Sequence, residues 1–220
     1  NVYKEALYNR LMVALNKAER DGLILKNPGN SIDRRLKPHS EPKERCYLTL
    51  DEIKQIIAVE YNYKNDIKNA FLFCCFCGLR HSDVVKLTWG EIVTAPDGST
   101  MIQTQMKKTK KFITIPLSEN AIAFLPEQGK AKKSDLVFPN LPDQPGNADV
   151  RLKVIIKKAG IDKHVTFHVA RHTFATLTLT YGADLYTVSK LLGHANVKTT
   201  QIYAKIVDEN KRKAVNLIPK

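Results

Sequence analysis

The stretch Phe71-Leu-Phe-Cys-Cys-Phe-Cys77, followed by Gly78-Leu-Arg80, is a very apolar part of this 220-residue chain. It predicts a helix over about 66–77, which ends at Gly78 because glycine adopts the left-handed backbone of a helix C-terminus. Three of the four cysteines lie here without a second pair at zinc-ligand spacing, so we interpret them as small buried apolar residues. Arg80 is then expected at a helix–helix junction, with Ser82 capping the next short helix through about residue 87.

Before this stretch, the sequence predicts the end of one domain and the start of another. Leucines recur at helical spacing from Leu7 to Leu15, and Gly22 is a stop signal. Residues 27–44 are rich in Pro, Asn, Ser and charge, which is typical of a linker. We therefore interpret residues 1–40 as the remnant of a helical domain plus linker, and residues 45–220 as a second domain.

The second domain begins with a predicted capping box, in which Thr49 and Glu52 exchange hydrogen bonds at a helix N-terminus. From about Glu91 the periodicity changes: residues 101–106 alternate apolar and polar side chains, and residues 112–116 form another extended stretch. A mainly helical α+β fold with a small antiparallel sheet of two or three strands is expected. Helical patterns resume at Ser118, and a proline-rich loop is expected over 139–146. The tip of the hairpin carries four lysines: Lys107, Lys108, Lys110 and Lys111.

The charge of the chain favours a polyanionic partner. Lysine and arginine total 35 against 22 acids, a net charge of +13. DNA, RNA or an anionic membrane surface would suit this excess, although it could also be a basic solvated surface without a specific role. No stretch approaches the ~20 apolar residues that span a bilayer, so no membrane segment is expected.

The first stretch that indicates chemistry is Thr166-Phe-His-Val-Ala-Arg-His-Thr-Phe-Ala-Thr176. His168 and Arg171 share a face of a predicted helix, where arginine suits phosphate oxygens and histidine can move a proton. A surface histidine beside a surface arginine is the alternative. His168 and His172 have the spacing of two zinc ligands, but Val169 stands where that motif needs a glutamate. We therefore expect no metal site and interpret His172 as a structural histidine.

The second such stretch is Lys190-Leu-Leu-Gly-His-Ala-Asn-Val-Lys-Thr-Thr-Gln-Ile-Tyr-Ala204. His194 follows a glycine at a predicted helix end, and Tyr203 comes nine residues later on a separate short helical segment. A tyrosine hydroxyl has a pKa near ~10, so it needs a base and a positive pocket to act as a nucleophile. Alternatively Tyr203 is a packing residue, the usual role of the eight tyrosines here.

Together, these stretches resemble the motif boxes of the tyrosine recombinases, the phage integrase family. Four segments occur in the order and at the spacing of that family, from about Cys46 to Lys205. The amino-acid sequences of these segments are most similar to those of integrases of mobile elements in Bacteroides-type bacteria. The four segments are Gly78-Leu-Arg80-His-Ser-Asp83, Lys108-Thr109, His168-Val-Ala-Arg171-His172-Thr173, and Leu192-Gly-His194 followed by Tyr203.

The resemblance implies that DNA is cut and rejoined without a metal or nucleotide cofactor. Tyr203 would attack the scissile phosphate to form a 3′-phosphotyrosyl link, which the 5′-hydroxyl of a partner strand then reverses. Arg80 and Arg171 would stabilise the negative charge that develops on the phosphate. Lys108 would protonate the leaving 5′-oxygen. Consistent with this expectation, the chain has no G-x-x-x-x-G-K-[ST] motif for a nucleotide.

Supporting roles are implied as well. His168 would assist proton removal from the tyrosine, His194 would hydrogen-bond a phosphate oxygen, and Asp83 would orient the site. Three further lysines, Lys107, Lys110 and Lys111, are expected to contact the DNA backbone or solvent.

The family resemblance also implies partners and a location. The expected partner is a double-stranded DNA site, bound by a tetramer of a protein that could be monomeric when free, in the bacterial cytoplasm. Residues 1–40 would come from a helical domain that clamps DNA. An amphipathic helix over 206–217 would pack on a neighbouring protomer or on its own domain. The alternatives are a non-catalytic basic DNA-binding protein and a type IB topoisomerase.

Overall fold

The computed structural model describes residues 2–38, 45–61, 66–108 and 110–203. The chain divides into two compact units, residues 1–44 and residues 45–220. The first unit contains the predicted leucine-rich helix, α1 (Val2–Arg20), and then two 3-10 helices, η1 (Pro28–Ser31) and η2 (Arg34–Leu36). That this unit is the remnant of a DNA-clamping domain stays a prediction.

The two 3-10 helices lie in the segment that was expected to be a loop, and local capping explains them. The side chain of Asn27 accepts a hydrogen bond from the Gly29 amide at 2.8 Å, and Pro28 holds the first helical position. Asp33 similarly caps η2 by accepting from the Arg35 amide at 2.8 Å. Short polar capping signals therefore order part of a segment whose composition alone predicts a linker.

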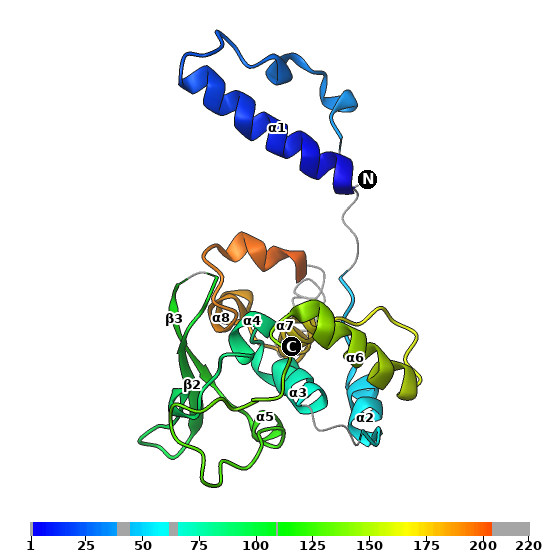
Figure 1. Cartoon of the computed structure of the whole chain (residues 1–220), viewed down its shortest axis with the longest axis vertical. Coiled ribbons are helices and arrows are strands. Elements are labelled where there is room, and N and C mark those ends of the chain that lie inside the picture. The colour runs from blue at the N-terminus through cyan, green and yellow to red at the C-terminus, as the bar shows by residue number, and fades with distance from the viewer. Residues whose placement is uncertain (1, 39–44, 62–65, 109, 204–220) are drawn as a thin grey trace, which may run out of the picture. The chain divides into compact units, whose positions relative to one another are not determined.

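The second unit is mainly helical, with one small sheet beside the helices (Figure 1). The predicted fold class is confirmed. Its elements are, in chain order, α2 (Leu50–Ala58), α3 (Ile67–Cys77), α4 (His81–Val84), η3 (Trp89–Glu91), β1 (Ile92–Thr94), β2 (Thr100–Gln105), β3 (Phe112–Pro116), α5 (Glu119–Ile122), α6 (Pro145–Lys158), α7 (Phe167–Thr180), α8 (Leu185–Leu191), η4 (Val197–Thr199) and η5 (Gln201–Tyr203).

Helix α3 lies in the core of this unit and packs against α5, α6 and α7. Its side chains are buried on nearly every side, as the apolar sequence predicts, and Phe71 meets Phe167 of α7 edge to face at 5.6 Å. Gly78 ends the helix with φ +75°, and a Cβ there would lie 2.5 Å from the ring of Phe174. Glycine thus allows both the turn and the close approach of α7, and the chain continues directly into Arg80.

The sheet has the strand order β1-β2-β3, and both strand pairs are antiparallel. Ile102 of β2 pairs with Ile115 of β3, and both side chains are buried, so this pair attaches the hairpin to the core. At the end of the hairpin, the amide of Met106 donates to Lys111 O, and the amide of Lys110 donates to Met106 O. These bonds close the turn that carries the predicted lysines.

Two predicted boundaries are wrong, and the local backbone explains both. Ser82 does not cap α4, because Arg80 occupies the extended N-cap position and its carbonyl accepts the Asp83 and Val84 amides. The proline-rich loop ends earlier than expected, since Pro145 begins α6 at a first-turn position that suits proline. The capping box of Thr49 with Glu52 is confirmed, with bonds of 2.7 and 3.2 Å.

The amphipathic helix predicted over 206–217 lies outside the described residues. Among the helices of the described ranges, none combines the length and apolar character needed to cross a bilayer.

Candidate active site

Arg80 is fixed at the α3–α4 junction by groups that surround its guanidinium. Its Nη1 lies 3.4 Å from the sulfur of Met106 and 3.8 Å from Oδ2 of Asp83. The other carboxylate oxygen of Asp83 accepts the Lys107 amide at 2.9 Å. Burial lowers the pKa of Arg80, and the charge of Asp83 partly offsets this shift. Asp83 therefore connects the first arginine to the lysine-bearing hairpin, and the orienting role expected for it stays a prediction.

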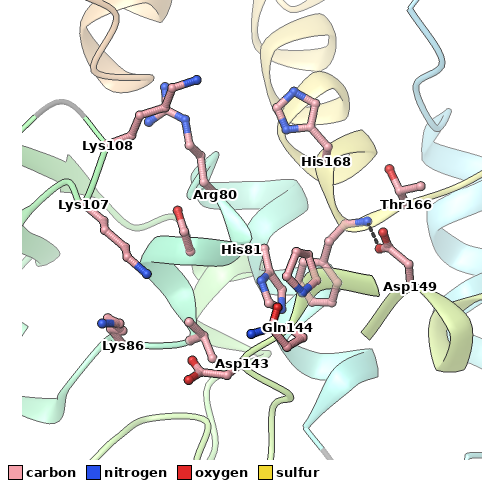
Figure 2. A pocket seen from close by; sticks show the side chains of 14 residues that line it. Arg80, His81, Lys86, Lys107, Lys108, Asp143, Gln144, Asp149, Thr166 and His168 are labelled. Carbon is pink, nitrogen blue, oxygen red and sulfur yellow. Dashed lines mark hydrogen bonds between the residues drawn. The ribbon is translucent and has the colours of Figure 1, made fainter. Parts of the chain in front are cut away.

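An open pocket of about 480 Å³ adjoins this arginine (Figure 2). The side chains that line it include Arg80, Lys107, Lys108 and His168. In Figure 2, the Arg80 and Lys108 side chains lie on one side of the pocket and the His168 ring lies opposite them. The far wall includes Asp143 and Asp149, and the Asp149 carboxylate accepts the Phe167 amide at 2.6 Å. The cationic side of the pocket suits an anionic group such as a phosphate.

Arg171 is deeply buried, with 3% of its surface exposed. Its Nη1 donates to Gly78 O at 2.9 Å and its Nη2 to Leu192 O at 2.5 Å. Burial, and then the charge of Arg80, lowers the pKa of Arg171 to about 9. A guanidinium has five N–H donors, so these two bonds leave donors for a ligand. Arg171 thus ties the ends of α3 and α8 together.

His194 lies just after α8 and is half-buried. Its Nδ1 is 2.8 Å from the hydroxyl of Thr200, a side chain with no exposed surface. Burial, followed by the charges of Arg171 and Arg80, lowers the pKa of His194 to about 4. The ring is therefore neutral near pH 7, and the Thr200 contact holds it beside the arginines.

Tyr203 is buried, and its hydroxyl is paired with a histidine of α7. The oxygen lies 2.5 Å from Nδ1 of His172, whereas His168 meets the His172 ring edge to face at 4.6 Å. Burial raises the pKa of Tyr203 to about 12, while the charges of Arg171 and Arg45 act in the opposite direction. The hydroxyl thus contacts a different histidine from the one expected to take its proton, and the role of His168 as a base stays a prediction.

His168 belongs to the same electrostatic cluster, although it lies at the exposed edge of α7. Partial desolvation lowers its pKa, and the charges of Arg171, Arg80, Arg45 and Lys108 add to this effect. These causes connect the histidine to both arginines and to the predicted general acid. The structure therefore gathers all six predicted catalytic side chains around α7 and the hairpin.

Some predicted residues lie apart from this cluster. Lys110 and Lys111 are exposed on the hairpin and do not line the pocket, whereas Lys107 and Lys108 do. Two residues near the site were not predicted from the sequence: Met106, which contacts Arg80, and Arg45, whose charge acts on several site residues. No sequence signal marks either one, since Met106 is one apolar residue of an alternating strand and Arg45 is one of 35 basic residues.

No group of three or more His, Cys, Asp or Glu side chains in the described part of the chain is arranged to hold a metal ion. That the reaction needs no metal stays a prediction.

Comparisons with known proteins identify the family of this chain. The model of the phage integrase family matches residues 46–210. A tyrosine recombinase of Thermosipho africanus is 30% identical over 96% of this chain and 76% of its own length. The tyrosine recombinase XerC of Caldanaerobacter subterraneus is 32% identical over 90% of this chain, which spans 57% of that relative.

A solved structure shares the fold. The Tn1549 transposon integrase, in complex with transposon right end DNA, superposes with a TM-score of 0.72 at 18% identity, over 95% of this chain and 77% of that one. Fold and side-chain cluster together define a catalytic domain of the tyrosine recombinase type. The chain belongs to the phage integrase family, because the family match covers well over half of its length.

Proposed function

We propose that this chain is a site-specific DNA recombinase or integrase that cuts and rejoins DNA through a 3′-phosphotyrosyl intermediate on Tyr203, without metal or ATP. The observation that carries the proposal is the clustering of Tyr203, Arg171 and His194 with an open cationic pocket that contains Arg80 and Lys108. A basic DNA-binding protein without catalysis would not need these side chains together.

The two arginines would supply the largest catalytic effect. When a tyrosine oxygen attacks phosphorus, negative charge accumulates on the non-bridging oxygens of the phosphorane. Arg80 faces the pocket, and Arg171 keeps donors beyond those used for Gly78 O and Leu192 O. Because both guanidinium groups are held before DNA binds, little reorganisation is needed when the charge develops.

Cleavage would exchange one phosphorus–oxygen bond for another. The bond between the Tyr203 oxygen and phosphorus forms while the bond from phosphorus to the 5′-oxygen breaks, and Lys108 gives its proton to the leaving oxygen. The phenolic proton would pass to His168, which is expected to act as the general base. Attack by a 5′-hydroxyl on the phosphotyrosine later restores the phosphodiester, so no external energy source is required.

His194 can donate to a phosphate oxygen in one tautomer only. If the Thr200 hydroxyl donates to Nδ1 at the observed 2.8 Å, then Nε2 carries the hydrogen and is a donor. The low pKa of His194 favours such a neutral ring over an imidazolium. This arrangement supports the phosphate-binding role expected from the sequence.

The proposed partner is a double-stranded recombination site, on which the protein acts as a tetramer in the bacterial cytoplasm. The net charge of +13 supports a polyanionic partner, and the solved Tn1549 relative is bound to DNA. Lys107, Lys110 and Lys111 would contact the backbone, and residues 1–40 would belong to a domain that clamps the duplex.

A covalent-capture experiment tests this function. The protein is incubated with a pool of duplexes of randomised sequence that carry a nick on the 3′ side of the cleavage position. The short released fragment, which carries the 5′-hydroxyl, then diffuses away. We expect an adduct that survives denaturation and that maps to Tyr203 by peptide mass spectrometry. The captured DNA, once sequenced, provides a defined substrate for later measurements.

Tyr203→Phe is the control, and it should abolish the adduct while DNA binding persists. Addition of EDTA should leave the adduct yield unchanged. An adduct that persists in Tyr203→Phe would contradict the proposal. Relaxation of supercoils without strand exchange between two captured sites would instead indicate a topoisomerase.

A further inference from the structure

The contact between His172 and Tyr203 joins two buried side chains through a hydrogen bond. Only 8% of the surface of His172 and 5% of that of Tyr203 is exposed, and their ring centroids are 5.9 Å apart. The hydroxyl of Tyr203 lies 2.5 Å from Nδ1 of His172, which is a short hydrogen bond between two buried groups. Loss of either partner would leave a buried polar atom unpaired.

The direction of this hydrogen bond follows from the surroundings. Burial, and then the charges of His168, Arg45, Arg171 and His194, lowers the pKa of His172 to about 4. A neutral ring has one nitrogen that donates and one that accepts. Since the phenol is protonated, its hydroxyl donates to Nδ1, and the hydrogen of the ring is then on Nε2.

The position of His172 in the chain relates the nucleophile to the phosphate-binding arginine. His172 directly follows Arg171, whose guanidinium is held by Gly78 O and Leu192 O. The segment that carries Tyr203 is also held by the contact of Thr200 with His194, and the Tyr203 ring packs in a small core with α7 and α8. The hydroxyl bond to His172 fixes the end of this segment, so the distance from nucleophile to arginine is set by consecutive residues of one helix.

We propose that His172 is a positioning residue, which holds the Tyr203 hydroxyl beside Arg171 of the same chain through an acceptor nitrogen and so prepares the nucleophile for attack on the DNA phosphate. This inference rests on the proposed function for its catalytic consequence. The docking of the tyrosine itself does not depend on that function, and it can be measured without DNA.

The first measurement is nitration of tyrosines by tetranitromethane in the DNA-free protein, followed by peptide mass spectrometry. Tyr181, which is 71% exposed, is the internal reference. Replacing His172 by Phe keeps a ring of similar size but removes the acceptor. We expect the nitration of Tyr203 relative to Tyr181 to rise about tenfold, as for the loss of one buried hydrogen bond.

Matched variants separate hydrogen bonding from packing. His172→Asn keeps an acceptor oxygen near the position of Nδ1 and should restore most of the protection, whereas His172→Leu should behave like His172→Phe. The Leu variant also serves if the Phe variant does not fold. His164→Ala, which removes an exposed histidine of the same region, should leave protection unchanged.

The second measurement is the single-turnover rate of adduct formation on captured DNA. We expect His172→Phe to lower this rate about 100-fold at saturating DNA, because a small displacement of a nucleophile has an effect of that size. His172→Asn should recover much of the rate. The dissociation constant for DNA should not change, because His172 is buried.

The two measurements distinguish a failure of the proposed docking of Tyr203 from a failure of the proposed recombinase function. Unchanged nitration in both His172→Phe and His172→Leu would overturn the docking, even if wild-type protein forms the adduct. A faster cleavage rate in His172→Phe would mean that the contact restrains the nucleophile instead of preparing it, which also overturns the proposal. Absence of any adduct in wild-type protein would refute the recombinase function, while the nitration result would still decide whether His172 docks Tyr203.

Discussion

The two halves of the candidate site differ in their exposure to solvent. One half, with Arg80, Lys108 and His168, lines an open pocket. The other half, with Arg171 and Tyr203, is almost fully buried, and its polar groups are paired within the protein. The open half would receive the proposed phosphate from solvent, whereas the buried half is held in place by its internal contacts. In the proposed function, different elements therefore bind the phosphate and position the nucleophile.

Substitution of the two arginines should show the largest difference between the open half and the buried half. Arg80→Ala should lower the rate of adduct formation about 10³-fold, since one charge stabiliser of the phosphorane is lost, and it should change the melting temperature little. Arg171→Ala should lower the rate at least as much. It should also destabilise the fold by about 3 kcal/mol, because Gly78 O and Leu192 O lose their buried charged donor.

Single-turnover cleavage measures the rate of adduct formation, and differential scanning calorimetry measures the melting temperature. The Arg171 variant should melt roughly 10 °C lower than wild type for a loss of that size. If Arg80→Ala destabilises the protein as much as Arg171→Ala does, the distinction between the open and buried halves does not hold.

Two lysines of the hairpin can be compared with each other, because Lys108 lines the pocket and Lys111 does not. Lys108→Ala should lower the rate about 100-fold at saturating DNA, because the general acid is removed. Lys111→Ala, at an exposed position outside the pocket, should leave that rate unchanged and reduce the salt dependence of DNA binding by about one unit of slope. Rates come from quenched reactions, and the slope comes from binding isotherms at several salt concentrations. An equal loss of rate in both variants would remove the special role of Lys108.

The smallest effect is expected in the pH dependence of stability. His194 has a folded-state pKa of about 4 against an ordinary value of 6.5, so between these values the unfolded chain binds more protons than the folded chain. Stability that is present above pH 6.5 is therefore lost as the pH falls toward 4. His194→Asn should show a shallower decline of melting temperature across this window than wild type. Parallel curves for the two proteins would contradict the low pKa.

The sequence predicted most of the fold because its signals are local. The apolar run before Gly78, the capping box of Thr49 and the alternating strands each depend on residues near one another in the chain, and all three predictions are confirmed. The boundary at Ser82 was wrong because Arg80 takes the N-cap position. The boundary at Pro145 was wrong because this proline lies in the first turn of α6 and not in the loop. The finer resemblance to integrases of Bacteroides-type bacteria stays a prediction.

The sequence by itself predicted which residues would carry the chemistry, since the order and spacing of the family motifs are properties of the chain. Only the tertiary structure decided how these residues pair. Tyr203 and His172 are 31 positions apart, and Arg80 and Met106 are 26 apart. Such contacts depend on how α7, the hairpin and the segment after α8 pack together, and no periodicity encodes that packing. For this reason Tyr203, one tyrosine among eight in the sequence, becomes in the fold a buried hydroxyl held beside an arginine.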